Sequence, residues 1–221
     1  MSTETSTAPT AEKRTETPVE RLERIVAART SRLQKEYQGN VSTAVAALAL
    51  LRRGINQGPG ADARILGHTV ADVEPAPEKL RGDHPTHAEI AAHAAMTLFA
   101  LHQQSQRTAS MHRVGYSFGR SARLLGRHTG NPDAVRARFT AVATATSWEE
   151  RLHHARGLIQ QLRANGIPLD YGRFARDLYY LQFPSGADSV RLAWGRDFYR
   201  VRNADDPETE DSDGDDADDN D

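Results

Sequence analysis

Helical periodicity is the feature that most limits what this chain can fold into. Apolar residues recur at alternating spacings of four and three, as in Trp148, Leu152, Ala155, Ile159 and Leu162, and such a stripe covers one face of an α-helix. No segment shows a convincing alternation of apolar and polar residues, which is typical of a half-buried strand. We therefore predict an all-α protein, a helical bundle of about seven to nine helices in two small lobes.

Short local signals indicate where these helices start and stop. Thr86 with Glu89, and Ser147 with Glu150, form capping boxes, in which each side chain of the pair bonds the backbone N–H of the other residue. Asn131-Pro132 is a typical helix start, and Gly166 is a typical end. These signals predict one helix that ends near Gly54 and others over about 61–68, 87–104, 132–145, 148–165, 171–182 and 188–201.

The two ends of the chain differ in composition from its middle. Residues 1–20 are rich in Ser, Thr, Glu and Pro, and residues 203–221 carry eleven Asp or Glu and no Lys or Arg. Such segments bury too little apolar surface to fold, so we predict disordered tails at 1–20 and 203–221. Residues 21–202 form the predicted helical domain, with an N-terminal lobe to about residue 86 and a C-terminal bundle over 87–202.

The net charge of −2 conceals a basic core. Without the two tails, residues 21–202 hold 26 Lys or Arg against 15 Asp or Glu, a net charge of +11. Only three of the 28 basic residues in the chain are lysines. Arginine suits phosphate recognition, because its planar guanidinium donates two parallel hydrogen bonds. A GC-rich genome also enriches arginine, but the core is basic in either case.

Composition also indicates the cellular compartment of the protein. The chain has no cysteine, so disulfides and thiolate metal sites are ruled out. The first twenty residues lack the apolar stretch of a signal peptide, and no run approaches the roughly 18 apolar residues of a membrane span. We expect a soluble, cytoplasmic protein.

Positive charge is concentrated in residues 111–127, MHRVGYSFGRSARLLGR, which contain four arginines and no carboxylate. On a helix with about 100° per residue, three of these arginines lie within about 40° of one another, and the fourth lies about 40° further round. The three are Arg113, Arg120 and Arg127, and the fourth is Arg123. Val114, Phe118, Ala122 and Leu125 would point the opposite way, toward the core. A helix here therefore presents an arginine stripe.

Two interpretations of this stripe compete, a phosphate-binding surface and an ordinary solvated helix face. A solvated face usually mixes both signs, whereas residues 105–138 contain seven arginines and a single acid, Asp133. This imbalance favours phosphate binding. Arg52-Arg53 form a second basic pair, although arginines at a helix C-terminus also interact favourably with the helix dipole.

Signals for catalysis are weak. The chain has nine histidines, but they form no HExxH motif, and no pair of them has a third ligand at a spacing typical of a metal site. Ser117 lies in GYSFG, which fits the letters of the G-x-S-x-G motif of hydrolases, but that motif requires a preceding strand, and none is predicted here. We expect a protein without enzymatic activity, metal or cofactor.

Four segments match one known family: MHRVGYSFGRSARLL, AVRARFTAVATA, WEERLHHARGLIQQLRANGIPLDYGRFARDLYYL and VRLAWGRDFY. They resemble the CasB family, the small subunit of the type I-E CRISPR surveillance complex Cascade. The similarity runs from about Leu51 to Tyr199, and the ending WGRDFY is its most specific part. The resemblance does not rest on the loop at 56–86 or on either tail.

The resemblance implies an all-α, non-enzymatic subunit. Two copies would lie side by side between the guide-bearing backbone subunits and the large subunit of the complex. They would contact guide RNA, the target DNA strand and the displaced strand, and so help to hold the R-loop open. The family's basic positions correspond to Arg52, Arg53, Arg113, Arg120, Arg123 and Arg138, and the charge pattern adds Arg107 and Arg127.

Two other classes of function remain open at this point. A helical DNA-binding regulator would need a helix-turn-helix, which the turn at Gly166-Ile167-Pro168 could imitate, although the proline and the apolar helix after it argue against one. A protein-binding adaptor would use its arginines to meet an acidic partner.

Overall fold

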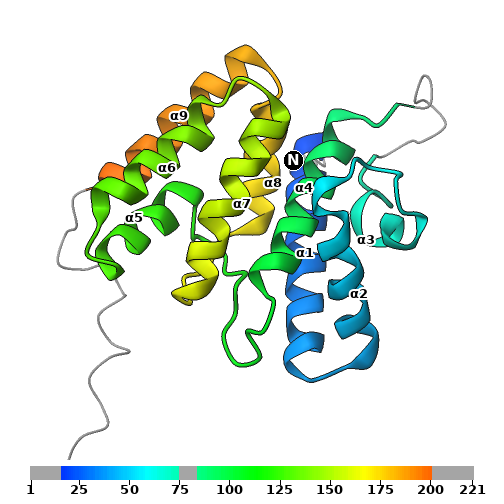
Figure 1. The fold of residues 1–221 in the computed structure, drawn as a ribbon. Coiled ribbons are helices and arrows are strands. Elements are labelled where there is room, and N and C mark those ends of the chain that lie inside the picture. Colours follow the sequence, from blue (N-terminus) through cyan, green and yellow to red (C-terminus); the bar gives the residue numbers. More distant parts are fainter. Residues whose placement is uncertain (1–15, 75–83, 201–221) are drawn as a thin grey trace, which may run out of the picture.

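The computed structural model describes residues 16–74 and 84–200, and within these ranges the regular structure is helical (Figure 1). This confirms the predicted all-α class. The α-helices are α1 (Pro18–Gln38), α2 (Ser42–Arg53), α3 (Leu66–Thr69), α4 (His87–His102), α5 (Phe118–His128), α6 (Pro132–Thr144), α7 (Trp148–Ala164), α8 (Tyr171–Tyr180) and α9 (Pro184–Tyr199), and two single 3₁₀ turns lie at Gly54–Asn56 and Ala63–Ile65. None of the described helices has the length and apolar character needed to cross a bilayer.

The helices pack in two groups (Figure 1). In one group α1, α2 and α8 pack around α4, and in the other α5 packs against α6, α7 and α9. Contacts of α7 with α4, and of α9 with α8, join the groups. The predicted division at about residue 86 follows chain order and assigns α4 and α8 to a C-terminal bundle, whereas both helices pack against α1 in the structure.

Helix α4 forms the centre of the first group. Thirteen of its 16 residues are buried, so it has no polar face, unlike an ordinary surface helix. Alanines supply many of these positions, and their small side chains let neighbouring helices approach closely. The predicted capping box opens the helix, because the Thr86 side chain accepts from Glu89 N–H and the Glu89 carboxylate accepts from Thr86 N–H.

A cluster of aromatic side chains joins the second group to α8. Phe118 of α5 lies 4.5 Å from Trp194 of α9 and 5.2 Å from Phe174 of α8, measured between ring centroids. Phe139 of α6 stacks on Phe198 at 4.8 Å. Trp194 and Phe198 are both buried, and their burial fixes α9 against α5.

Several helix boundaries differ from the sequence prediction. Helix α1 begins at Pro18, inside the predicted 1–20 tail, because Thr17 and Glu20 form a capping box. Helix α9 begins at Pro184 rather than near residue 188, because proline fits the first position of a helix, where no N–H partner is needed. The predicted helix at 61–68 is a 3₁₀ turn followed by the short α3. The predicted tail at 203–221, and residues 1–15 of the other tail, lie outside the described residues.

Candidate nucleic-acid interface

The basic segment 111–127 is a loop followed by a helix, so the prediction of one continuous helix is wrong. Helix α5 begins only at Phe118, after Ser117, whose hydroxyl accepts from Arg120 N–H and caps the helix. Gly115 has φ +85°, a left-handed conformation that an α-helix does not contain. Arg113 therefore lies on the loop, and Val114 is 76% exposed instead of facing the core.

Contacts from distant parts of the chain hold this loop in place. The Gln34 side chain on α1 accepts from His112 N–H at 2.7 Å and donates to the His112 carbonyl at 3.2 Å. Leu169 N–H donates to the Met111 carbonyl at 3.0 Å. The Asp170 carboxylate accepts from Gly115 N–H at 2.9 Å. The loop is thus bonded on both sides, and its side chains start from a fixed backbone.

Tyr116 brings two arginines of the interrupted stripe together. The guanidinium of Arg120 lies 4.1 Å from the centre of the Tyr116 ring, and that of Arg113 lies 5.2 Å from it. Both distances fall within the range of a cation–π contact. Arg120 also donates to the Gly115 carbonyl at 3.3 Å. The loop and α5 therefore present these two charges side by side, although one helix does not carry both.

Arg127 extends the same basic surface. It lines a shallow groove of about 440 Å³ with Tyr116, and Gly166 and Pro168 form part of the wall. Arg113 lines an adjoining groove that shares Gly166 and Pro168. We refer to Arg113, Arg120 and Arg127 around Tyr116 as the arginine surface. Three of the four arginines predicted to form a stripe thus share one surface.

The fourth arginine, Arg123, does not lie on the predicted exposed stripe. It is only 9% exposed, and its Nη1 donates to the Arg200 carbonyl at 3.2 Å, where the chain leaves α9. Arg120 and Arg123 both lie within α5, so the late start of this helix does not change their relative orientation around its axis and does not explain the burial of Arg123. Arg123 is covered because α9 packs along that side of α5.

Beside the arginine surface lies a small polar cavity of about 120 Å³, which we call the arginine pocket. Four arginines meet there, two from α5, one from α8 and one directly after α9, together with a single carboxylate from α9. The pocket is lined by Gly115, Ser117, Arg120, Arg123, Arg173, Asp197 and Arg200. Arg173 and Arg200 were not predicted as site residues, because no local sequence pattern shows that α8 and α9 meet α5 at this point.

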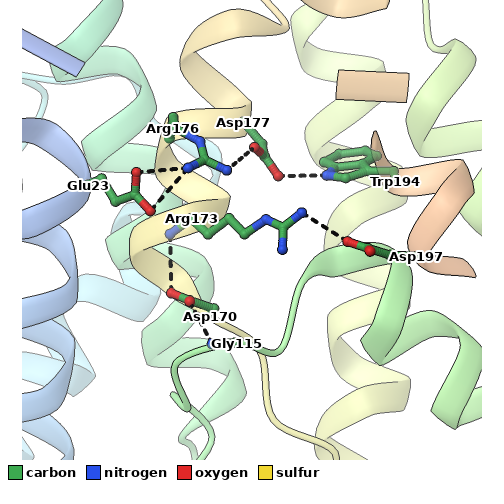
Figure 2. Close-up of polar contacts among 8 residues, drawn as sticks. All are labelled: Glu23, Gly115, Asp170, Arg173, Arg176, Asp177, Trp194 and Asp197. Atoms are coloured by element: carbon green, nitrogen blue, oxygen red, sulfur yellow. Dashed lines mark hydrogen bonds and ion pairs between the residues drawn. The ribbon is translucent and has the colours of Figure 1, made fainter. Parts of the chain in front are cut away.

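Helix α8 positions the pocket through a polar network (Figure 2). Arg173 donates to Asp197 of α9 at 2.9 Å, and Asp170, the N-cap of α8, accepts from both Arg173 N–H and Gly115 N–H. On the opposite side of the network, Arg176 binds Glu23 of α1 at 3.0 Å. The loop, α1 and α9 are all bonded to this one helix.

A buried carboxylate completes the network shown in Figure 2. Asp177 accepts from the indole N–H of Trp194 at 2.7 Å. Burial raises the pKa of Asp177 to about 6, and the Trp194 hydrogen bond and nearby arginines offset only part of this effect. The bond therefore ties α9 to α8 at the cost of a buried charge at neutral pH.

The remaining predicted arginines lie elsewhere. Arg107 donates to the Tyr37 carbonyl at 3.0 Å and lies 4.0 Å over the Tyr37 ring, so it ties the loop after α4 to the end of α1. Arg52 is half-buried, and burial lowers its pKa. Arg53 ends α2 and Arg138 lies on α6, both exposed. These four do not line the arginine pocket or lie over Tyr116.

The side chains first considered for catalysis or metal binding do not form such a site in the described residues. Ser117 is the N-cap of α5, with its hydroxyl bonded to the backbone. Within the described residues, no three His, Asp or Glu side chains form a group that could hold a metal ion. The geometry at the arginine surface is suited to binding anions through fixed cationic groups.

Comparisons with known proteins agree with this architecture. The profile of the family described as CRISPR-associated protein Cse2 matches residues 47–199. The structure is similar to the crystal structure of CasB from Thermobifida fusca, with a TM-score of 0.69 and 34% sequence identity over 80% of this chain and 97% of that one. No curated protein matches the sequence.

A second crystal structure shares the fold. It is a CRISPR-associated protein of the Cse2 family from Thermus thermophilus, with a TM-score of 0.56 and 23% identity over 79% of this chain and 98% of that one. The chain belongs to the Cse2 family of CRISPR-associated proteins. This confirms the resemblance to CasB, the small subunit of the type I-E Cascade complex.

Proposed function

We propose that this protein is the non-catalytic small subunit of a cytoplasmic type I-E Cascade complex and that its arginine surface binds nucleic-acid backbone. The ligands are the guide RNA and the target and displaced DNA strands, and the bound subunit stabilises the R-loop. Its protein partners are the backbone and large subunits and a second copy of itself. The observation that carries the proposal is the convergence of Arg113, Arg120 and Arg127 around Tyr116.

This arrangement suits recognition of backbone rather than of sequence. In such complexes base pairing between guide and target reads the sequence, so the protein needs only to recognise charge and shape. Tyr116 is 8% exposed beneath the two guanidiniums, so it orients arginines and offers no free face for stacking a base. Binding is therefore electrostatic, and the clamped loop reduces the entropy lost when the arginines are ordered.

The alternative of a helix-turn-helix regulator is disfavoured by the position of α8. A recognition helix must project a polar face into the major groove. Helix α8 instead packs against both α1 and α4, and Phe174, Ala175 and Leu178 are buried. In the adaptor alternative the arginines bind an acidic protein instead of nucleic acid, and the following experiment distinguishes the two.

The test is the binding of single-stranded DNA and RNA to the full chain over a series of salt concentrations. Replacing Arg113, Arg120 and Arg127 together by glutamine removes three phosphate contacts. We expect weaker binding to every sequence alike, and a loss of about 2 in the slope of log affinity against log salt, at roughly 0.7 per contact for a single strand.

A matched control carries the same change in charge at a distance from the arginine surface. The variant R24Q/R32Q/R64Q replaces three exposed arginines that form ion pairs with Glu16, Glu36 and Asp62. It should keep the original affinity and salt slope. If both triple variants behave like the unchanged protein, the arginine surface does not bind nucleic acid, and the adaptor interpretation gains support.

The assembled complex provides a second readout. Purification of the protein from its source should bring a guide-sized RNA and other Cascade subunits with it. With the Arg113, Arg120 and Arg127 variant, the complex should retain the guide RNA, because the other subunits hold it, but form a less stable R-loop. A normal R-loop lifetime in the variant would contradict the proposed role.

A further inference from the structure

The chain leaves the described fold at the arginine pocket. Arg200 directly follows α9, and it lines the pocket with Arg120, Arg123 and Arg173. The hydrogen bond from Arg123 Nη1 to the Arg200 carbonyl fixes the backbone at this point. Whatever follows Arg200 in the sequence is therefore tethered at the rim of a cavity that four arginines line.

The sequence that follows has the opposite charge. Residues 203–221 contain eleven Asp or Glu and no Lys or Arg, and the first acids, Asp205 and Asp206, come five and six residues after Arg200. An extended chain spans at most about 3.3–3.6 Å per residue, so five residues reach up to roughly 17 Å. The pocket that Arg200 itself lines is within this reach.

We propose that the acidic segment 203–221 binds the arginine pocket and the adjoining arginine surface, and there competes with nucleic acid. The competition rests on the proposed function, whereas the docking does not. The lining of the pocket carries one carboxylate, Asp197, against four guanidiniums, and Asp197 is itself bonded to Arg173. Carboxylates suit such a site, because they accept paired hydrogen bonds from a guanidinium.

The tether makes this contact effective although each ion pair is weak. A short flexible linker gives its ligand an effective concentration in the mM range. If the segment binds its own pocket with a dissociation constant about tenfold lower than that concentration, it weakens the binding of a competing strand about tenfold. Exposed ion pairs are screened by salt, so the competition should disappear at high ionic strength.

The acidic segment should discriminate between nucleic acids of different length, because longer strands offer more phosphate charges. A strand that spans the whole arginine surface offers many phosphates and displaces the segment, whereas a short oligonucleotide or a small anion does not. The segment therefore acts as a built-in competitor that favours long strands over short fragments.

The first experiment changes only the charge of the segment in the full chain. All eleven Asp and Glu of 203–221 are replaced by Asn and Gln, and the affinity for a single-stranded DNA is measured at low and high salt. We expect about tenfold tighter binding at low salt, with the difference lost at high salt. A control in which the same 19 residues are shuffled should bind like the unchanged chain, since charge and not order carries the effect. Equal affinity of the neutral and unchanged chains at low salt would overturn the competition.

A second experiment measures docking without nucleic acid. Because the chain has no cysteine, Ser212→Cys supplies a single thiol for a nitroxide label. The label should broaden the amide signals of Ser117 and Arg120 at low salt, but not that of Ala47 on α2. High salt, or the change R173Q/R200Q, should remove the broadening.

The two experiments separate the inference from the function on which it builds. Absence of broadening at low salt would overturn docking, whatever the nucleic-acid result. Broadening with unchanged strand affinity in the neutral variant would contradict the competition. If no variant binds any strand, the proposed function is wrong, and the broadening still decides whether the acidic segment docks.

Discussion

Arg113 and Arg120 lie on different elements, the loop after α4 and helix α5, yet both guanidiniums lie over the ring of Tyr116, at 5.2 and 4.1 Å from its centre. Two like charges repel, so the shared ring offsets part of the cost of holding them together. The relationship gives a buried aromatic residue a role in binding a ligand that it does not touch.

Replacing Tyr116 by leucine should therefore weaken nucleic-acid binding without any change in charge. Leucine keeps an apolar side chain under the surface but removes both cation–π contacts, which contribute about 0.5–1 kcal/mol each at exposed sites. We expect a loss of about fivefold in affinity for single-stranded DNA, measured by filter binding. The variant Y116F retains the ring and should bind normally. If Y116L and Y116F bind equally well, the ring does not orient the arginines.

Replacing Gly119 by alanine should strongly destabilise the protein. A Cβ atom at this position would overlap the Trp194 carbonyl oxygen, so α5 and α9 would have to move apart. We expect a loss of about 3 kcal/mol in the free energy of unfolding, measured by urea denaturation. Gly157 on α7 is the matched control, because a Cβ there meets nothing within 4 Å. G157A should be neutral or stabilising by up to about 1 kcal/mol. Equal stability of the two variants would refute the close contact of α5 with α9.

Stability should fall as the pH drops below about 6.5, in part because of His102. Burial lowers the pKa of His102 from 6.5 to about 3, so between these values the unfolded chain binds a proton that the folded protein does not. This difference costs about 2 kcal/mol at pH 5. In H102Q, which can still pair with the Tyr171 hydroxyl, the loss of stability between pH 7 and pH 5 should be smaller by about that amount. His93 and His112, whose pKa values burial also lowers, should leave a residual slope. Identical slopes for the two proteins would show that His102 is not kept neutral.

Asp177 should change the stability of the fold with pH in the direction opposite to His102. Its pKa is raised from 3.8 to about 6, so the folded protein retains a proton that the unfolded chain releases, and stability is lost as the pH rises through this window. The variant D177N carries no charge to bury. Its stability relative to the unchanged protein should rise by about 2 kcal/mol between pH 4.5 and pH 7, as followed by urea denaturation. D188N, at an exposed position on α9, should show no such trend, and a flat difference for D177N would contradict the raised pKa.

Local signals in the sequence predict the helices well. The capping box at Thr86 and the start at Pro132 lie where the sequence places them, because each signal involves residues within one turn. Ser147 caps α7 as predicted, but the Glu150 carboxylate accepts from Thr146 N–H, so the reciprocal half of the predicted capping box is not formed with Ser147. The start of α5 was missed, because the loop before it is held by Gln34 and Asp170 from distant segments. These tertiary bonds, together with the left-handed Gly115 and the Ser117 N-cap, keep residues 111–117 out of the helix.

The candidate site was predictable in its residue types but not in its geometry. Charge density pointed to Arg113, Arg120 and Arg127, which do share a surface. Helical phase alone placed Arg123 on that surface, whereas packing of α9 against α5 buries it. Arg173 and Arg200 join the pocket only through the tertiary fold, which no short window of sequence encodes.

The ion pair between Glu23 and Arg176 joins residues that are 153 positions apart, and the apolar faces of α1 and α8 meet beside it. At a synthesis rate of about 5–20 residues per second, roughly 8–30 s separate the emergence of these two residues from the ribosome. During that time α1 has no α8 to pack against, although its residues Leu22, Ile25 and Val26 are buried in the finished protein. The nascent chain is therefore most vulnerable to aggregation early, and its fold closes only when almost all of it has been made.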